Sequence, residues 1–161
     1  MSERMVERDE RGREIVYVSG KDIPRRAQWN KHINNLVERG EMEKAMSATR
    51  DMMNLGIEPD VITFNTLIKG WCKVGKMSVA MHVTKVMLNM GIYPDVPTYN
   101  VLIQGYCQQH DMMKAKRLVE SMIKVNLIPD IITFTQIVKA LCDMRLVGDA
   151  TILVDALLKS D

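Results

Sequence analysis

Apolar side chains recur at spacings of three and four along most of the chain, which is the periodicity of amphipathic helices. Between residues 61 and 95 two such stretches flank a break at Gly75, and the same pair returns in register every 35 residues. Each pair predicts two helices folded back on each other as an αα-hairpin. The expected helices are 27–38, 41–54, 62–73, 76–89, 97–108, 111–124, 132–142 and 146–159.

The joint between hairpins carries almost the same phrase three times: EPDVITFN at 58–65, YPDVPTYN at 93–100 and IPDIITFT at 128–135. This register divides the chain into three complete repeats and a fourth that is truncated at its C-terminal end; the repeats are 26–60, 61–95, 96–130 and 131–161. Because a single hairpin cannot bury its apolar faces alone, the repeats are expected to stack. The predicted fold is an all-α superhelical solenoid of αα-hairpins.

The ends of the predicted helices carry residues suited to those positions. One position inside the second helix of each repeat is always the small residue alanine, at Ala45, Ala80, Ala115 and Ala150. Gly56, Gly91 and Asn126 follow the second helices, where a left-handed residue is common. Asp60, Asp95 and Asp130 immediately precede the next first helix and are expected to be N-caps.

Residues 1–25 stand outside the repeats. The segment REIVYVSGKD alternates like a short strand but shows no partner segment in the sequence, so an N-terminal arm that is extended or disordered is expected. The opening MSERMVERDERGRE mixes acids with bases and lacks an apolar core, unlike a secretory signal or an acid-poor transit peptide.

Composition narrows the function classes only slightly. With 47% hydrophobic and 26% charged residues the chain suits a folded domain, and it lacks an apolar run long enough for a membrane span. Its net charge of +2 permits a polyanionic partner without arguing for one.

Catalytic and metal-binding signatures are missing from the sequence. Cys72, Cys107 and Cys142 occupy the same slot of successive repeats, beyond disulfide reach of one another, and are expected to be small core residues. His32, His82 and His110 fall in different slots without ligand-spaced partners. No GxSxG, P-loop or HExxH motif is present. We therefore expect no enzyme activity, no metal and no cofactor.

The fifth position of each repeat is polar, which helix stability does not explain. Asn30, Asn65 and Asn100 occupy it in three repeats, and Thr135 in the fourth. Asparagine is a poor helix former beyond the cap. These side chains are expected to line the concave surface at regular intervals, each beside the aspartate that closes its own repeat. Such a ladder of identical polar groups suits a ladder-like ligand.

The unit VITFNTLIKGWCKVGKM...GIYPD resembles the pentatricopeptide repeat of the plain 35-residue type, which is abundant in plant organelles. The resemblance covers residues 26–161 and is strongest in the middle two repeats. The tetratricopeptide pattern W-x-x-L-G-x-x-Y is missing. Membership of this family implies single-stranded RNA binding with one base per repeat.

By the same resemblance, the fifth and last residues of a repeat choose the base, and the second residue packs against base faces. Carried over, the pairs Asn30–Asp60, Asn65–Asp95 and Asn100–Asp130 resemble the uracil-preferring combination, and Thr135 the purine-choosing type, giving U-U-U-purine from 5′ to 3′. The implied base-stacking residues are Ala27, Ile62, Pro97 and Ile132. Lys73 matches a lysine that meets phosphate in the family.

The resemblance implies an RNA-binding adaptor in a mitochondrion or chloroplast that supports RNA processing, stability or translation. Recognition of about four nucleotides is too short to find a unique transcript unaided. The alternative is a protein-interaction scaffold, or a small subunit of a larger ribonucleoprotein assembly. The last predicted helix is expected to be a docking site for a second copy or a protein partner, because it is strongly apolar, with Ile152, Leu153, Val154, Leu157 and Leu158.

Overall fold

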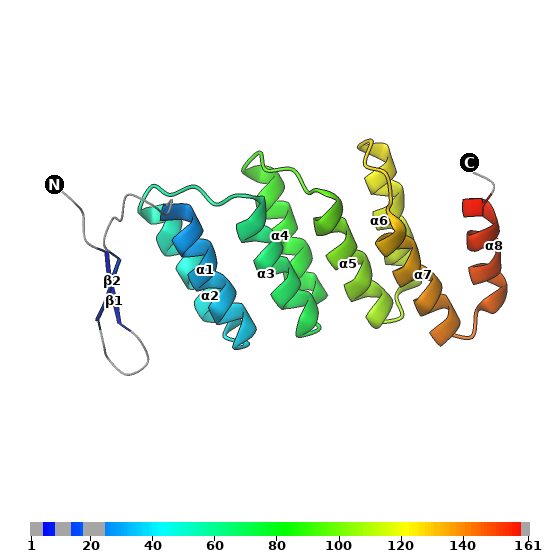
Figure 1. Cartoon of the computed structure of the whole chain (residues 1–161), viewed down its shortest axis with the longest axis horizontal. Helices are drawn as coiled ribbons and strands as arrows, with labels where there is room; N and C mark the ends of the chain where they lie inside the picture. The colour runs from blue at the N-terminus through cyan, green and yellow to red at the C-terminus, as the bar shows by residue number, and fades with distance from the viewer. Residues whose placement is uncertain (1–4, 9–13, 18–24, 159–161) are drawn as a thin grey trace.

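The computed structural model describes residues 5–8, 14–17 and 25–158, and within them the repeats are helical throughout (Figure 1). The helices are α1 (Arg25–Glu38), α2 (Met42–Asn54), α3 (Val61–Lys73), α4 (Met77–Asn89), α5 (Val96–Gln108), α6 (Met112–Lys124), α7 (Ile131–Asp143) and α8 (Val147–Leu158). Their bounds agree with the expected helices to within two residues, and the predicted all-α solenoid is confirmed. None of these helices is long and apolar enough to cross a bilayer.

The helices form two layers along the solenoid (Figure 1). Each first helix packs on the first helix of the next repeat, in the series α1, α3, α5 and α7. The second helices α2, α4 and α6 contact the first helices on either side but, within the described chain, not one another. The first helices are therefore the more closely spaced layer and line the inner, concave side.

Left-handed residues end the helices and turn the chain back. The second helices are followed by Gly56 (φ 74°), Gly91 (φ 74°) and Asn126 (φ 59°), as the sequence predicts. His110 (φ 58°) takes the same conformation after α5, so this turn does not depend on glycine. Because each hairpin turn has the same geometry, equivalent side chains of successive repeats line up along the solenoid.

The core runs along the whole length between the two layers. Ala45, Ala80 and Ala115 are completely buried, as the small residue at this position predicts. Gly70 adds a close approach that the sequence analysis overlooked. A Cβ at Gly70 would lie 2.6 Å from the Met42 sulfur and 2.8 Å from a Val37 methyl. Glycine here lets α3 sit directly on the preceding hairpin.

The cysteine slot differs between the interior and the end of the solenoid. Cys72 and Cys107 are buried, as expected, but Cys142 is exposed, so the prediction that all three are core residues is wrong. The reason is the repeat architecture: α3 and α5 are each covered by the next first helix, whereas α7 is followed only by its own second helix, α8, and by no further first helix among the described residues.

A short hairpin precedes the repeats. Strand β1 (Met5–Arg8) pairs antiparallel with β2 (Glu14–Tyr17), with Val6 opposite Val16. The expectation that the alternating segment has no partner is therefore wrong, because the partner MVER alternates too briefly to be read as a strand from sequence. Residues 1–4, 9–13, 18–24 and 159–161 lie outside the described part.

Candidate nucleic-acid interface

Each first helix after α1 begins with an aspartate N-cap, as predicted. The Asp60 carboxylate accepts a hydrogen bond from the Thr63 backbone N–H at 3.0 Å, and the Thr63 hydroxyl accepts one from the Asp60 N–H at 3.1 Å. Asp95 and Thr98 form the same reciprocal capping box at the start of α5. Asp130 caps α7 through the Thr133 N–H at 3.0 Å. The caps orient these carboxylates at the junctions between first helices.

The fifth-position asparagines reach across the junction to these caps. Asn30 Nδ2 donates to Asp60 Oδ1 at 3.1 Å, and Asn65 Nδ2 donates to Asp95 Oδ1 at 3.3 Å. Asn100 Nδ2 lies 3.1 and 3.3 Å from the two oxygens of Asp130. The structure thus brings together the residue pairs that the sequence analysis assigned to each repeat, although this contact leaves their role in base reading a prediction.

A buried threonine completes each pair, and the sequence analysis missed it. The Thr63 hydroxyl lies 2.5 Å from Asn30 Oδ1, and the Thr98 hydroxyl lies 2.6 Å from Asn65 Oδ1. Thr133 contacts Asn100 in the same way. All three threonines are completely buried. The available signal was a threonine three residues after each boundary aspartate, the spacing of a capping box.

These hydrogen bonds lower the pKa of the boundary carboxylates. Partial burial alone would raise the pKa of Asp60, but hydrogen bonds from the Thr63 backbone, the Asn30 amide and the Thr63 hydroxyl outweigh it and hold the pKa below its usual value. The pKa of Asp95 is lowered by the equivalent bonds against the same burial effect. At Asp130 the Thr133 backbone bond is the main cause of a lowered pKa. The three carboxylates are therefore ionised at neutral pH.

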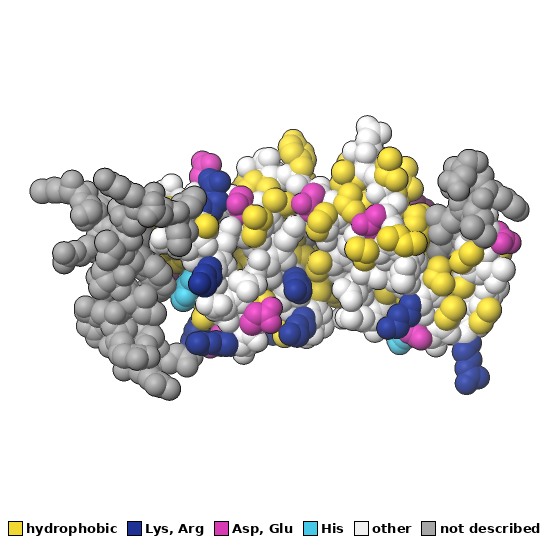
Figure 2. Space-filling model, viewed as in Figure 1, with side chains coloured by type: hydrophobic (Ala, Val, Ile, Leu, Met, Phe, Trp, Pro, Cys, Tyr) yellow, Lys and Arg dark blue, Asp and Glu magenta, His cyan; other side chains and the backbone are white. Residues whose placement is uncertain are grey.

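The second-position residues stand next to these pairs and are open to solvent. Ile62 is 59% and Ile132 54% exposed, and Ala27 and Pro97 are also exposed. Figure 2 shows this face, with acidic side chains near the starts of α3, α5 and α7, hydrophobic ones around them and basic ones lower down. Solvent-exposed isoleucines beside an ordered polar pair form a surface against which a flat ring can pack.

The remaining predicted site residues are more isolated. Thr135 is exposed, and its hydroxyl donates to its own backbone at Ile131 O, 2.6 Å away, with no boundary aspartate opposite it in the described residues. Lys73 is exposed at the end of α3. Among the residues that the structure covers, no group of three or more histidine, cysteine or acidic side chains is placed to hold a metal ion.

Solved structures share this fold. The crystal structure of the pentatricopeptide repeat protein PPR10 from maize matches with a TM-score of 0.72 and 24% identity, over 83% of this chain and 19% of that one. PPR10 in complex with an 18-nt psaJ RNA element matches with a TM-score of 0.75 and 22% identity, over 85% of this chain and 20% of that one. The PPR domain of Arabidopsis thaliana protein-only RNase P 1 in complex with tRNA matches with a TM-score of 0.60 and 18% identity, over 81% of this chain and 72% of that one.

The chain spans about a fifth of the length of the PPR10 structures. No curated protein shows significant similarity to it. Three overlapping segments, 26–73, 59–108 and 94–143, match the PPR repeat family, and together they cover most of the chain. Their spacing agrees with the 35-residue period and with the hairpins described above. The chain therefore belongs to the PPR repeat family.

Proposed function

We propose that the chain is a sequence-selective single-stranded RNA-binding protein that reads one base with each repeat. The observation that carries this proposal is the ladder of asparagine–aspartate pairs, which repeats at each junction between first helices and lies beside exposed apolar side chains. A ligand with one flat, hydrogen-bonding group per repeat would match that spacing. The maize PPR10 structure with an 18-nt RNA element supports the same conclusion by analogy.

The hydrogen-bonding capacity of the asparagine explains why uracil is the expected base. In the pair with Asp95, Asn65 uses one Nδ2 hydrogen for the carboxylate and one Oδ1 lone pair for Thr98. One N–H donor and one acceptor position remain. Uracil offers a carbonyl acceptor next to the N3–H donor, which complements them. Cytosine has an unprotonated N3, which an ionised aspartate opposes.

Base stacking would add affinity unevenly along the chain. Ile62 and Ile132 present exposed branched side chains that can pack on base faces, whereas Ala27 offers little surface. We expect U-U-U-purine from 5′ to 3′ for Asn30–Asp60, Asn65–Asp95, Asn100–Asp130 and Thr135. The fourth base is specified by Thr135 alone within this chain.

Phosphate contacts are expected to be few. By the family resemblance, Lys73 is the lysine expected to meet phosphate, but the equivalent positions of the other repeats hold Glu38, Gln108 and Asp143. Because each neutralised phosphate adds to the salt dependence, binding should weaken only moderately as salt rises. Specificity would then rest mainly on the bases.

The proposed role is that of an adaptor without chemistry of its own, acting in a mitochondrion or chloroplast in RNA processing, stability or translation. Recognition of about four nucleotides fits a subunit of a larger ribonucleoprotein assembly. The direct test is titration of oligo(U) and oligo(A) at two salt concentrations. Preference for oligo(U), weakened by salt, supports the proposal, and equal or undetectable binding of both overturns it.

A second candidate function is protein docking at the C-terminal end. Here Val147 is 60% and Ile152 68% exposed, while Met77, which occupies the slot of Val147 two repeats earlier, is 5% exposed. The side chains of Leu153, Leu157 and Leu158, which were expected to contribute, lie outside the described part of the structure. The exposed apolar surface favours an association there, with a second copy or a protein partner.

A further inference from the structure

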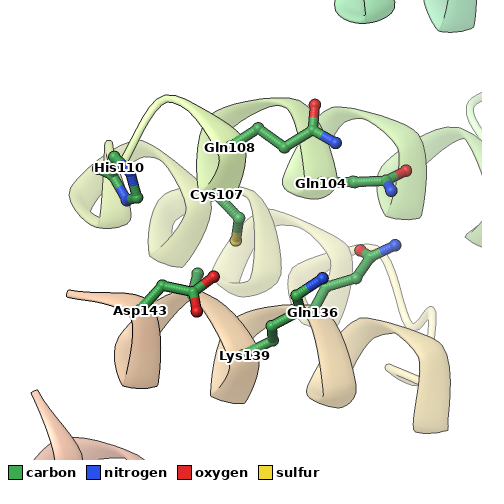
Figure 3. Close-up of a pocket in the computed structure, with 8 residues that line it drawn as sticks. Gln104, Cys107, Gln108, His110, Gln136, Lys139 and Asp143 are labelled. Carbon is green, nitrogen blue, oxygen red and sulfur yellow. The ribbon is translucent and has the colours of Figure 1, made fainter. Parts of the chain in front are cut away.

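A polar cleft of about 320 Å³ lies between α5 and α7, on the first-helix layer (Figure 3). From α5, Gln104, Gln108 and His110 border it, the last lying just beyond the helix, and from α7, Gln136, Lys139 and Asp143. Cys107 and Ala140 form its floor. The volume is in the range of small-ligand sites, and the lining is rich in hydrogen-bonding groups.

Gln136 points to the kind of group that the cleft would accept. Its Oε1 atom is buried and has no hydrogen-bond partner in the described residues. A buried acceptor left unpaired costs free energy, so a donor from a ligand or from water would be favoured there. The nearby Lys139 ammonium is exposed and supplies a positive charge. The cleft thus offers an unpaired hydrogen-bond acceptor, Gln136 Oε1, beside a positive charge, the Lys139 ammonium, that attracts an anion.

The cleft adjoins the base-reading positions. Gln136 directly follows Thr135, and Gln104 lies one helical turn beyond Asn100. From Thr135 to Lys139 the helix advances about 6 Å, comparable with the reach of a nucleotide from base to phosphate. In Figure 3, Gln104 and Gln136 lie toward one end of the cleft and His110 and Asp143 toward the other. The Asp143 carboxylate repels an anion, so a phosphate is favoured at the end near Gln104.

We propose that this cleft binds the ribose–phosphate unit joining the third and fourth bases, with the 2′-hydroxyl donating to Gln136 Oε1 and the phosphate held by Lys139 and the Gln104 amide. The proposal rests on the RNA-binding function proposed above and extends it from bases to the sugar. A 2′-hydroxyl is what distinguishes RNA from DNA at a single site. The cleft would therefore make the chain selective for ribose at this position.

The other junctions lack this combination. The positions equivalent to Gln136 hold Lys31, Thr66 and Val101, and those equivalent to Lys139 hold Asn34, Lys69 and Gln104. At these two positions, glutamine together with lysine occurs only in the fourth repeat. Sugar selectivity is accordingly expected at one linkage and not along the whole RNA.

The test uses the full chain and fluorescence anisotropy with U-U-U-A oligonucleotides that carry either ribose or 2′-deoxyribose at the third nucleotide. Q136M keeps a similar volume without the acceptor. It should weaken binding of the all-ribose probe roughly two- to tenfold, as expected for one lost hydrogen bond, and leave the deoxy probe unchanged. K139Q should reduce the salt slope, which is the slope of the logarithm of the binding constant against the logarithm of salt concentration, by about 0.7 for both probes. Lys85→Gln, which replaces an exposed lysine of α4, is the matched control and should change neither the affinity for the probes nor the salt slope.

Equal weakening of both probes by Q136M, or no weakening of either, would overturn the ribose assignment. An unchanged salt slope in K139Q would overturn the phosphate assignment. In each case a retained preference for uracil over adenine at the third base would leave the proposed function standing. Failure of the unaltered chain to prefer any RNA would overturn both.

Discussion

Asn65 and Asp95 are joined by a 3.3 Å hydrogen bond across a repeat boundary, and both side chains also bond the buried Thr98. The same three residues cap α5, connect neighbouring repeats and present an ordered amide to the concave surface. The network therefore stabilises the fold whether or not RNA is bound. It also fixes the orientation of Asn65 in the free protein, so a base would meet a preorganised donor and acceptor.

Replacing Thr98 with valine should destabilise the solenoid. The change removes the acceptor for the Asp95 N–H and the donor to Asn65 Oδ1 while it keeps the volume. We expect a loss of about 1–3 kcal/mol in the free energy of unfolding, measured by urea denaturation. Thr66→Val is the control, since that hydroxyl only bonds its own helix backbone at Ile62. Equal effects of the two changes would refute a role for the network.

Stability should fall in acid because of the boundary aspartates. Asp60, Asp95 and Asp130 each have a folded-state pKa below the ordinary value of 3.8. A lowered folded-state pKa contributes stability that is complete above 3.8 and is lost as the pH falls through the folded-state values. Thermal unfolding followed from about pH 5 to about pH 2 should show this decline. It should be smaller in Asp95→Asn, and a decline of the same size in that variant would contradict the assignment.

The cysteines should differ sharply in reactivity. Burial raises the pKa of Cys72 to about 12 and that of Cys107 to about 11, which leaves almost no thiolate at neutral pH. Cys142 is exposed on α7. A thiol reagent should modify Cys142 rapidly in the native protein and the other two only after denaturation, which mass spectrometry of digested samples would show. Protection of Cys142 in the native protein would mean that something covers the end of the solenoid.

That end is also expected to associate. Val147 is exposed, whereas its equivalents Met42 and Met77 are buried, and Ile152 adds exposed apolar surface on the same helix. The sedimentation coefficient should therefore rise with concentration. Ile152→Glu should suppress the rise without unfolding the chain, whereas Met113→Glu, at an exposed apolar position on α6, should not. A concentration-independent sedimentation coefficient would argue against self-association.

The sequence was sufficient for the fold because the repeat supplies the same information four times. Each helix could be checked against three equivalents, so the predicted helix bounds came within two residues. The asparagine–aspartate pairs were also predictable, since a fixed period aligns the fifth position of one repeat with the boundary aspartate. The exposure of Cys142 was missed because equivalent positions were expected to be equally buried, which requires every repeat to have a neighbour on both sides.

Other features depend on side-chain geometry that a repeat pattern does not contain. Thr63, Thr98 and Thr133 recur as regularly as the asparagines, yet only the structure shows that their hydroxyls bridge two repeats. The cleft beside Gln136 arises from residues that differ between repeats, so no periodicity points to it. The hairpin was missed because β1, the four-residue partner of β2, is too short for an alternation signal.

The central claim, that Asn65 and Asp95 read a base, is tested most directly by a double variant that combines Asn65→Thr with Asp95→Asn. The variant keeps an N-cap and small polar side chains, and the loss of the Asn65 bonds with Thr98 and Asp95 should cost about 1–3 kcal/mol of stability. Binding is measured with the repeats embedded in a longer array of the same kind, against oligonucleotides that differ only at the second base. The account predicts that preference moves from uracil towards adenine by about 1–3 kcal/mol. An unchanged preference for uracil in the folded variant would contradict it and leave these pairs with a structural role alone.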